Sequence, residues 1–391
     1  MTSAYIHIPF CERICYYCDF NKVFLEGQPV ENYVDLLLRE IELAMRSSKV
    51  SNVETIYIGG GTPTSLSARQ LERLLKGLRE LLPFIEGNEF TIEANPGDLT
   101  VEMFSVIKEY GINRISLGVQ TFDNELLQKI GRRHTAEDVG QTLEILQREN
   151  FQNISLDLIY ALPDQTIESF QKTLKMALSF ALPHYSLYSL ILEDHTIFMN
   201  WMRDSKFALP DEDLAADMFE TVLDYMHKYG LQQYEIANFA KPGFESKHNL
   251  RYWNNEHYFG FGSGAAGYLG NLRYKNHGPI QHYLNSLRKF ELPIIKREEL
   301  SLQNQMEEEM FLGLRKANGV SKRLFFEKFG VSFSEIYGEV SQQLIERGLL
   351  CDDGENISLS RKGMLVGNIV FEKFLLCQCN VTMSQNFKRH C

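Results

Sequence analysis

Short apolar runs alternate with longer amphipathic segments over roughly the first 240 residues of the chain. The short runs predict seven strands: Ala4–Pro9, Glu54–Gly59, Glu89–Ala94, Arg114–Val119, Ile154–Ile159, His184–Leu190 and Tyr234–Asn238. The longer segments predict helices near residues 30–46, 67–81, 101–110, 136–149, 166–180 and 211–228. Ser67 before Gln70 and Thr166 before Ser169 are typical of helix N-termini.

This alternation predicts repeated βα units and therefore an α/β fold built on a parallel sheet. About six units are fewer than the eight of a closed barrel, so we expect an incomplete (β/α)6 barrel over residues 1–238. A doubly wound sheet is the competing arrangement.

Polar residues follow several of the predicted strands. Gly59–Thr64 comes after the second strand, Glu93–Gly97 closes the third, Gln120 ends the fourth, and Asp157 interrupts the apolar fifth. In a βα barrel the strand ends and the loops after them form the functional face. These segments are therefore expected to share one site.

The character of the chain changes after the predicted barrel. Residues 239–295 form a connecting region rich in His, Asn, Gly and aromatic residues. Residues 296–376 predict a smaller, mostly helical domain that resembles a winged helix. Residues 300–376 contain nine Lys and Arg against eleven Asp and Glu, a net charge of −2 that disfavours DNA binding. The tail, 377–391, lacks apolar periodicity and is expected to be disordered.

Composition narrows the class of protein further. The 391 residues are 44% hydrophobic and 23% charged, and the net charge of −11 argues against a nucleic-acid partner. No apolar run approaches the roughly 20 residues that span a bilayer, and the N-terminus does not resemble a signal peptide. We therefore expect a cytoplasmic protein, in which clustered cysteines are metal ligands more often than disulfides.

Three of the seven cysteines, Cys11, Cys15 and Cys18, lie within eight residues with the spacing Cys-x3-Cys-x2-Cys. A cubane iron–sulfur cluster normally takes four thiolates. Three thiolates could thus bind a [4Fe-4S] cluster and leave one iron open for a ligand such as S-adenosylmethionine (SAM). The alternatives are a zinc site with a distant fourth ligand, or three unrelated thiols.

The triplet and several further segments together resemble the oxygen-independent coproporphyrinogen III oxidase family of radical SAM proteins over roughly residues 1–375. The segments are Tyr5–Cys11, Gly59–Thr64, Glu93–Pro96, Ile115–Phe122 and Asp157–Pro163. The resemblance implies a [4Fe-4S] cluster and SAM as cofactors. It also implies SAM contacts at Tyr5, Gly60, Gly61, Thr62, Glu93, Gln120, Arg132 and Asp157.

Residue chemistry suggests a role for some of these positions. The carbonyls of Gly60 and Gly61 could accept the SAM ammonium, and the Arg132 guanidinium could pair with the SAM carboxylate. Glu93 or Asp157 could accept hydrogen bonds from the ribose. Structural alternatives stay open, because Arg132 could belong to a solvated basic turn.

Two features separate the chain from the oxidase itself. The oxidase has a fourth cysteine two residues after the third, where this chain has Phe20. Residues His248–Trp253 resemble the His-Asn-x-x-Tyr-Trp signature of the HemW branch, whose members are heme chaperones. The resemblance therefore implies a protein that binds heme and transfers it to acceptor hemoproteins of the respiratory chain. A radical SAM enzyme that decarboxylates a porphyrinogen is the alternative.

Heme binding needs an axial ligand and an apolar slot. His248 and Tyr252 are the candidate ligands, with Trp253 beside them to pack against a flat ring. A structural role for this aromatic cluster is the competing interpretation. The acidic chain offers no electrostatic attraction to anionic lipid, so membrane contact is expected only through protein partners. The oligomeric state, monomer or homodimer, stays open.

Overall fold

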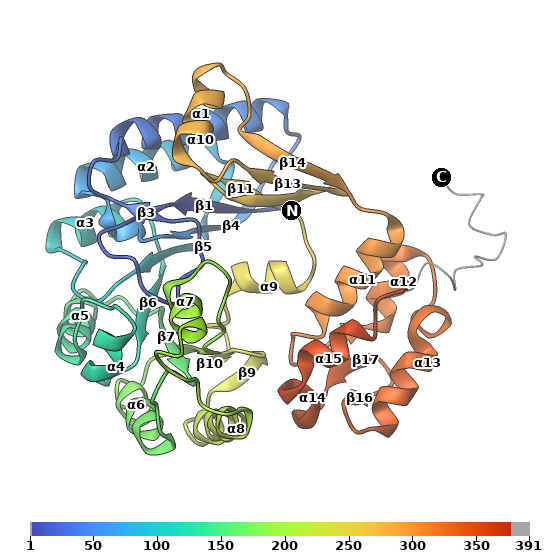
Figure 1. Cartoon of the computed structure of the whole chain (residues 1–391). Coiled ribbons are helices and arrows are strands. Elements are labelled where there is room, and N and C mark those ends of the chain that lie inside the picture. The colour runs from blue at the N-terminus through green and yellow to red at the C-terminus, as the bar shows by residue number, and fades with distance from the viewer. Residues whose placement is uncertain (1, 377–391) are drawn as a thin grey trace. The chain divides into compact units, whose positions relative to one another are not determined.

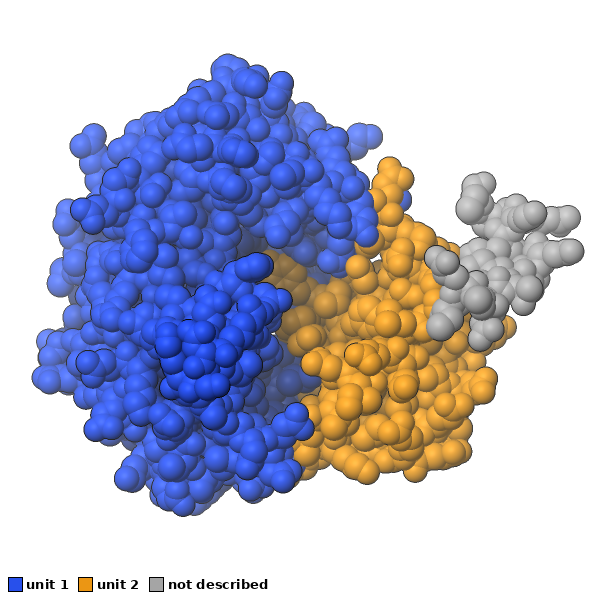
Figure 2. All heavy atoms as spheres, in the orientation of Figure 1, with its two compact units in different colours: residues 1–251, 256–298 blue, residues 252–255, 299–391 orange. Residues whose placement is uncertain are grey.

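The computed structural model describes residues 2–376, so the predicted disordered tail, 377–391, lies outside the described residues. The chain divides into two compact units (Figure 2). Unit 1 comprises Met1–Arg251 and Glu256–Glu298, and unit 2 comprises Tyr252–Asn255 and Glu299–Cys391. Within the described part of the chain, no helix is long and apolar enough to cross a membrane.

Six parallel strands form the centre of unit 1 (Figure 1). They lie in the sheet in chain order: β1 (Thr2–Ile8), β4 (Val53–Gly60), β5 (Phe84–Ala94), β6 (Arg114–Gln120), β7 (Ile154–Tyr160) and β8 (His184–Ser189). A doubly wound sheet reverses its strand order at a switch point, whereas sequential right-handed crossovers place every connecting helix on one face. The observed order confirms the predicted incomplete barrel over the doubly wound alternative.

Helices between these strands cover the outside of the barrel (Figure 1). They are α1 (Val30–Ser47), α2 (Ala68–Leu81), α3 (Val101–Glu109), α4 (Asn124–Lys129), α5 (Ala136–Arg148) and α6 (Ile167–Ser179). The predicted N-terminal signals are confirmed, because Ser67 and Gln70 form a capping box and the Thr166 hydroxyl accepts from the Ser169 amide.

The two faces of the parallel sheet differ in chemistry. One face carries buried aliphatic and aromatic side chains that pack against the helices, among them Ile6, Ile58, Ile92, Leu117 and Leu158. The other, which we call the inner face, carries polar side chains from every strand: Ser3, Tyr5, His7, Thr55, Tyr57, Glu89, Thr91, Glu93, Arg114, Ser116, Ser155, Asp157, His184 and Ser186. The interiors of βα barrels are usually filled with branched apolar residues, so this inner face is unusually polar.

Further strands extend the sheet at both edges. Beyond β8 lie β10 (Asn238–Ala240) and β9 (Gln232–Glu235), and beyond β1 lie β11 (Tyr258–Phe261), β12 (Ala266–Leu269), β13 (Leu272–Asn276) and β14 (Ile294–Glu299). The predicted strand Tyr234–Asn238 is wrong, because a turn at Ile236 and Ala237 divides it into two antiparallel strands. The Glu235 carboxylate stabilises that turn by accepting from the Ala237 amide at 3.2 Å.

The remaining elements of unit 1 are short strands and helices outside the parallel sheet. They are β2 (Phe10–Cys11), β3 (Val23–Phe24), the 3-10 helix η1 (Pro63–Ser65), α7 (Ile197–Arg203), α8 (Glu212–Lys228) and α10 (Ile280–Arg288), together with α9 (Lys247–Trp253), whose last two residues belong to unit 2. Helix α9 and strands β11–β14 account for most of the predicted connecting region.

Unit 2 is a small helical domain with an antiparallel sheet. Its helices are α11 (Leu302–Gly313), α12 (Lys322–Phe329), α13 (Phe333–Glu346), α14 (Arg361–Leu365) and α15 (Gly367–Glu372). Its strands pair in the order β15 (Val320–Ser321), β17 (Asn356–Leu359) and β16 (Leu350–Asp352). Its core contains tilted and edge-on contacts among the rings of Phe325, Phe329, Phe333, Tyr337 and Phe374.

A buried carboxyl joins α1 to the added strands. Glu40 is 2% exposed, and it accepts hydrogen bonds from the Gly262 amide at 2.9 Å, the Asn276 side chain at 2.6 Å and the Tyr283 hydroxyl at 2.6 Å. Burial raises the pKa of Glu40 from 4.5 to about 7, although the three donors oppose the shift. This carboxyl ties the N-terminal βα unit to residues more than 200 positions away.

Replacing Glu40 with alanine should lower the free energy of unfolding by roughly 3 kcal/mol, because three buried donors lose their acceptor. The pKa of Glu40 is raised in the folded state, so its contribution is fully present below about pH 4.5 and is lost as pH rises through about 7. Glu40→Gln should therefore gain stability relative to the unsubstituted chain as pH rises from about 5 to about 8. Denaturant titrations measure this, with the exposed Glu42→Gln as control; a pH-independent difference would contradict it.

Candidate functional site

The three cysteines of the triplet lie on the loop that leaves β1. Cys11 is 7% exposed, and Cys15 and Cys18 are half-buried. The loop is closed by the pairing of β2 with β3, in which the Val23 amide donates to the Pro9 carbonyl at 2.8 Å. The three thiols therefore lie at the carboxyl edge of the sheet, as the sequence predicted.

The geometry of the triplet bears on the choice between one metal ion and a cluster. Within the described part of the chain, no three His, Cys, Asp or Glu side chains converge closely enough to bind a single ion. A tetrahedral zinc site needs such convergence, whereas a cubane cluster places each thiolate on a different iron.

The electrostatic surroundings of the thiols depend on burial and on two cations. Burial raises the pKa of Cys11, and it raises the pKa of Cys18 to about 11, whereas the charge of Lys22 acts in the opposite direction on both thiols. Metal binding replaces the thiol proton, so Lys22 and Arg132 would offset part of the negative charge of bound thiolates.

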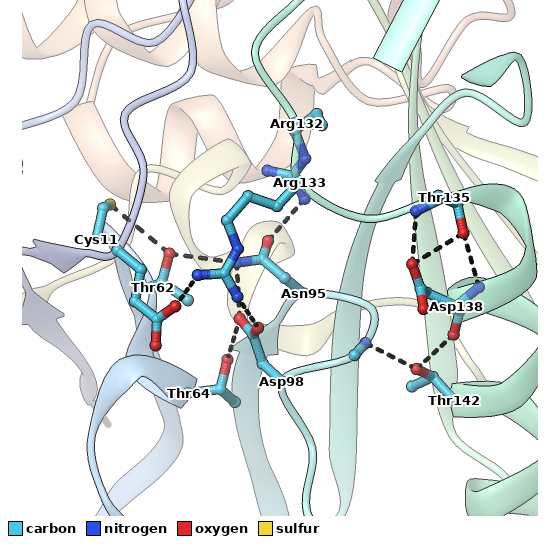
Figure 3. Close-up of polar contacts among 12 residues, drawn as sticks. Cys11, Thr62, Thr64, Asn95, Asp98, Arg132, Arg133, Thr135, Asp138 and Thr142 are labelled. Atoms are coloured by element: carbon cyan, nitrogen blue, oxygen red, sulfur yellow. Dashed lines mark hydrogen bonds and ion pairs between the residues drawn. The ribbon is translucent and has the colours of Figure 1, made fainter. Parts of the chain in front are cut away.

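A chain of hydrogen bonds connects two of the thiols, and Figure 3 shows its part from Cys11 through Thr62 and Asn95 to Arg132. The Thr62 hydroxyl contacts the Cys11 sulfur at 3.6 Å, and the Asn95 amide donates to Thr62 at 3.3 Å. Arg132 donates to the Asn95 side-chain oxygen at 2.7 Å and to the Cys15 sulfur at 3.6 Å. Thr62 and Arg132, both predicted from the sequence, therefore lie beside the triplet, and Asn95 joins them.

The glycine-rich turn packs directly against the cysteine loop. A Cβ atom on Gly60, whose φ is +118°, would lie 2.5 Å from the His7 ring, and one on Gly61 would lie 2.7 Å from the Pro9 backbone. Only glycine allows this approach without displacing the loop. The turn thus holds the end of β4 against the residues that precede Cys11.

Glu93 lies at the end of β5 and faces the same turn. Its carboxylate accepts from the Tyr57 hydroxyl at 2.8 Å and from the Gly60 amide at 3.1 Å. Burial, the largest effect, raises the pKa of Glu93 from 4.5 to about 7, so the group is close to half ionised at neutral pH. Tyr5, from β1, stacks on Tyr57 with ring centroids 6.2 Å apart.

Two further predicted residues lie on β6 and β7. Gln120 has a left-handed backbone with φ +66° at a register shift after Gly118, a strained conformation for a non-glycine residue. Asp157 accepts hydrogen bonds from Ser116 at 2.8 Å and from Ser155 at 3.1 Å, and burial raises its pKa. All eight residues predicted to contact SAM come from the carboxyl edge or the inner face of one sheet.

A cavity of about 230 Å³ opens beside the triplet. It is lined by residues that include Cys15, Thr62, Asn95 and Arg132. Next to it, Arg133 pairs with Glu12 of the cysteine loop and lies 3.7 Å from Asp98 (Figure 3). These ion pairs tie the loop to the segments that follow β5 and α4.

The two heme-ligand candidates differ in position. His248 is 1% exposed, its Nδ1 is 2.7 Å from the Thr55 hydroxyl, and its ring stacks on Tyr57 with centroids 5.1 Å apart. Burial lowers the pKa of His248 to about 3, which keeps the imidazole neutral. Tyr252 is half-buried and belongs to unit 2. His248 therefore faces the polar inner face of the sheet and not a solvent-exposed surface.

Several polar residues of the inner face were missed by the sequence analysis. They are Thr91, Arg114, Ser116, Ser155, His184 and Ser186, all buried. The signal for them is the strict alternation of polar and apolar residues in strands that a parallel sheet buries on both sides. Scoring that alternation strand by strand would have identified them.

Comparisons with known proteins agree with this geometry. Residues 5–177 match the radical SAM superfamily, and residues 300–366 match the HemN C-terminal domain. The chain is 52% identical over 382 residues to the heme chaperone HemW of Lactococcus lactis, covering 97% of this chain and 98% of that protein. It is 47% identical over 376 residues to the heme chaperone HemW of Bacillus subtilis, covering 96% and 99% of the two chains.

A solved structure resembles the fold over nearly the whole chain. The coproporphyrinogen III oxidase HemN of Escherichia coli, described as a radical SAM enzyme, superimposes with a TM-score of 0.84 at 25% identity, covering 96% of this chain and 90% of that one. The full-length identities to HemW proteins are much higher. The chain belongs to the HemW family of the radical SAM superfamily.

Proposed function

We propose that this protein is a heme chaperone that binds heme and transfers it to acceptor hemoproteins of the respiratory chain. The observation that carries the proposal is the identity of 52% to a protein named heme chaperone HemW over 97% of the chain. The neutral His248 supports it, since a neutral imidazole is the form that coordinates iron. Contact with membrane-bound acceptors would then go through protein partners.

Cys11, Cys15 and Cys18 would hold a [4Fe-4S] cluster, and SAM would bind beside it. The cluster supplies an electron source and an open iron for a ligand. Arg132 lies beside Cys15 at 3.6 Å and offers a planar guanidinium to a carboxylate. Glu93, Gln120 and Asp157 would orient the rest of the cofactor from the ends of β5, β6 and β7.

Oxygen-independent decarboxylation of coproporphyrinogen is the second candidate function. The fold similarity to HemN favours it. Phe20, which is 59% exposed, occupies the position where the resemblance places the oxidase's fourth cysteine. The chaperone is therefore the preferred function.

Anaerobic reconstitution with iron and sulfide should give a brown protein with about four irons per chain. Cys15→Ser should lose most of this iron, because one of the three thiolates is removed. Cys351→Ser, which changes an exposed cysteine outside the triplet, is the matched control and should bind iron normally. Metal analysis and visible absorbance measure the result; stoichiometric zinc without iron would refute the cluster.

The affinity of the reconstituted protein for SAM should increase as pH rises through about 7. The raised pKa of Glu93 means that its ionised, hydrogen-bond-accepting form predominates only above that pH. Glu93→Gln should bind SAM roughly 10-fold more weakly at about pH 8 and lose this pH dependence. Anaerobic equilibrium dialysis measures both quantities. An unchanged slope in the variant would show that Glu93 does not contact the cofactor.

Titration with hemin should produce a Soret band, and this band should be weaker in His248→Ala. Tyr252→Phe tests the second candidate ligand in the same way. Because the pKa of His248 is lowered to about 3, hemin binding through it should not weaken as pH falls from about 8 to about 5. His257→Ala, an exposed histidine of the same unit, is the control. An unchanged spectrum in His248→Ala would exclude that ligand.

A further inference from the structure

Arg114, the first residue of β6, has no partner that accounts for its charge. The residue is 2% exposed and is among the largest fully buried side chains of the described chain. Its Nε has no hydrogen-bond partner, and the described residues provide it with no ion pair. Buried arginines are almost always paired, because an isolated buried charge is strongly unfavourable.

A second unpartnered polar atom lies next to it. Thr91 on β5 is the register partner of Arg114, so the two side chains lie side by side on the inner face. Thr91 is 0% exposed, and its hydroxyl oxygen also lacks a hydrogen-bond partner. A cation and a hydroxyl, both buried and both unsatisfied at adjacent positions, form a site that a small anionic group would satisfy.

The rings around Arg114 are neutral and do not balance its charge. Two histidines within its electrostatic reach, His184 and His248, have pKa values lowered first by burial and then by Arg114, so both are neutral. Two tyrosines, Tyr57 and Tyr234, have raised pKa values and are also neutral.

Asp157 is the carboxyl group whose pKa is affected by the charge of Arg114. Its carboxylate already accepts hydrogen bonds from the Ser116 and Ser155 hydroxyls; burial raises its pKa, and the charge of Arg114 lowers it. It therefore does not supply the missing partner. The other carboxyl groups of the inner face, Glu89 and Glu93, likewise accept hydrogen bonds from groups other than Arg114.

We propose that Arg114 and Thr91 bind a carboxylate of a ligand that enters the inner face of unit 1. This inference rests on the proposed function, under which the carboxylate is a heme propionate. A guanidinium binds a carboxylate through two parallel hydrogen bonds, and a hydroxyl adds a third donor. His248 lies within the electrostatic reach of Arg114, so the candidate iron ligand and the propionate site share one region.

Comparing hemin with hemin dimethyl ester, in which both propionates are uncharged, tests the proposal on the unsubstituted holoprotein. The ester should bind roughly 10- to 100-fold more weakly, the range expected for losing a charge-assisted pair. Equal affinity for the two porphyrins would overturn the propionate site and leave heme binding intact. Failure to bind either porphyrin would remove the proposed function as well.

Substitutions of Arg114 and Thr91 then test whether these residues cause the difference in affinity between hemin and its ester. Arg114→Gln should bind hemin and its ester with similar affinity, Arg114→Lys should recover part of the preference, and Thr91→Val should reduce it. Arg148→Gln, which changes an exposed arginine of α5, is the control. If Arg114→Gln weakens both porphyrins equally, the arginine is structural and the proposal fails. Loss of SAM binding with unchanged porphyrin preference would assign the carboxylate to SAM and would also overturn it.

Discussion

The structure of unit 1 depends on a period-two pattern that stays in register across six parallel strands. Apolar residues such as Ile58 and Leu117 point towards the helices, and polar residues such as Tyr57 and Ser116 point inwards. Parallel sheets are normally apolar on both faces, so polar residues here must find partners within the protein or in a ligand. A one-residue shift in the pairing of any strand would turn its apolar side chains to the inner face and its polar side chains towards the helices.

Contacts of the inner-face residue Tyr57 connect the carboxyl edge of the sheet, where SAM is proposed to bind, to the heme-ligand candidate His248. Tyr57 donates to Glu93 at 2.8 Å, and its ring stacks on His248 at 5.1 Å. A residue predicted to contact SAM and a residue predicted to bind heme therefore touch one tyrosine. At the edge itself, Thr62, Asn95 and Arg132 link the sulfurs of Cys11 and Cys15. One set of contacts thus lies at the cysteine loop, and a second set extends from β5 to α9.

Much of this fold was predictable because strands with strong apolar runs and well-capped helices carry local signals. The SAM positions were predictable only through resemblance, since a lone Arg132 has no distinctive local pattern. Strands β11–β14 were missed because Gly, Asn and aromatic residues mask their alternation, and α7 is only seven residues long. Arg114 was missed because it begins an apolar run, and its isolation becomes visible only when neighbouring strands are placed beside it.

The central claim is that a radical SAM scaffold serves here to carry heme. The most direct test is to mix the hemin-loaded, cluster-reconstituted chain anaerobically with a heme-free respiratory cytochrome and follow both Soret bands. The Soret band of the chain should decrease as that of the cytochrome appears, and coproporphyrinogen III incubated with SAM and reductant should be unchanged. Absence of transfer, together with vinyl products from coproporphyrinogen, would contradict the account and identify an oxidase.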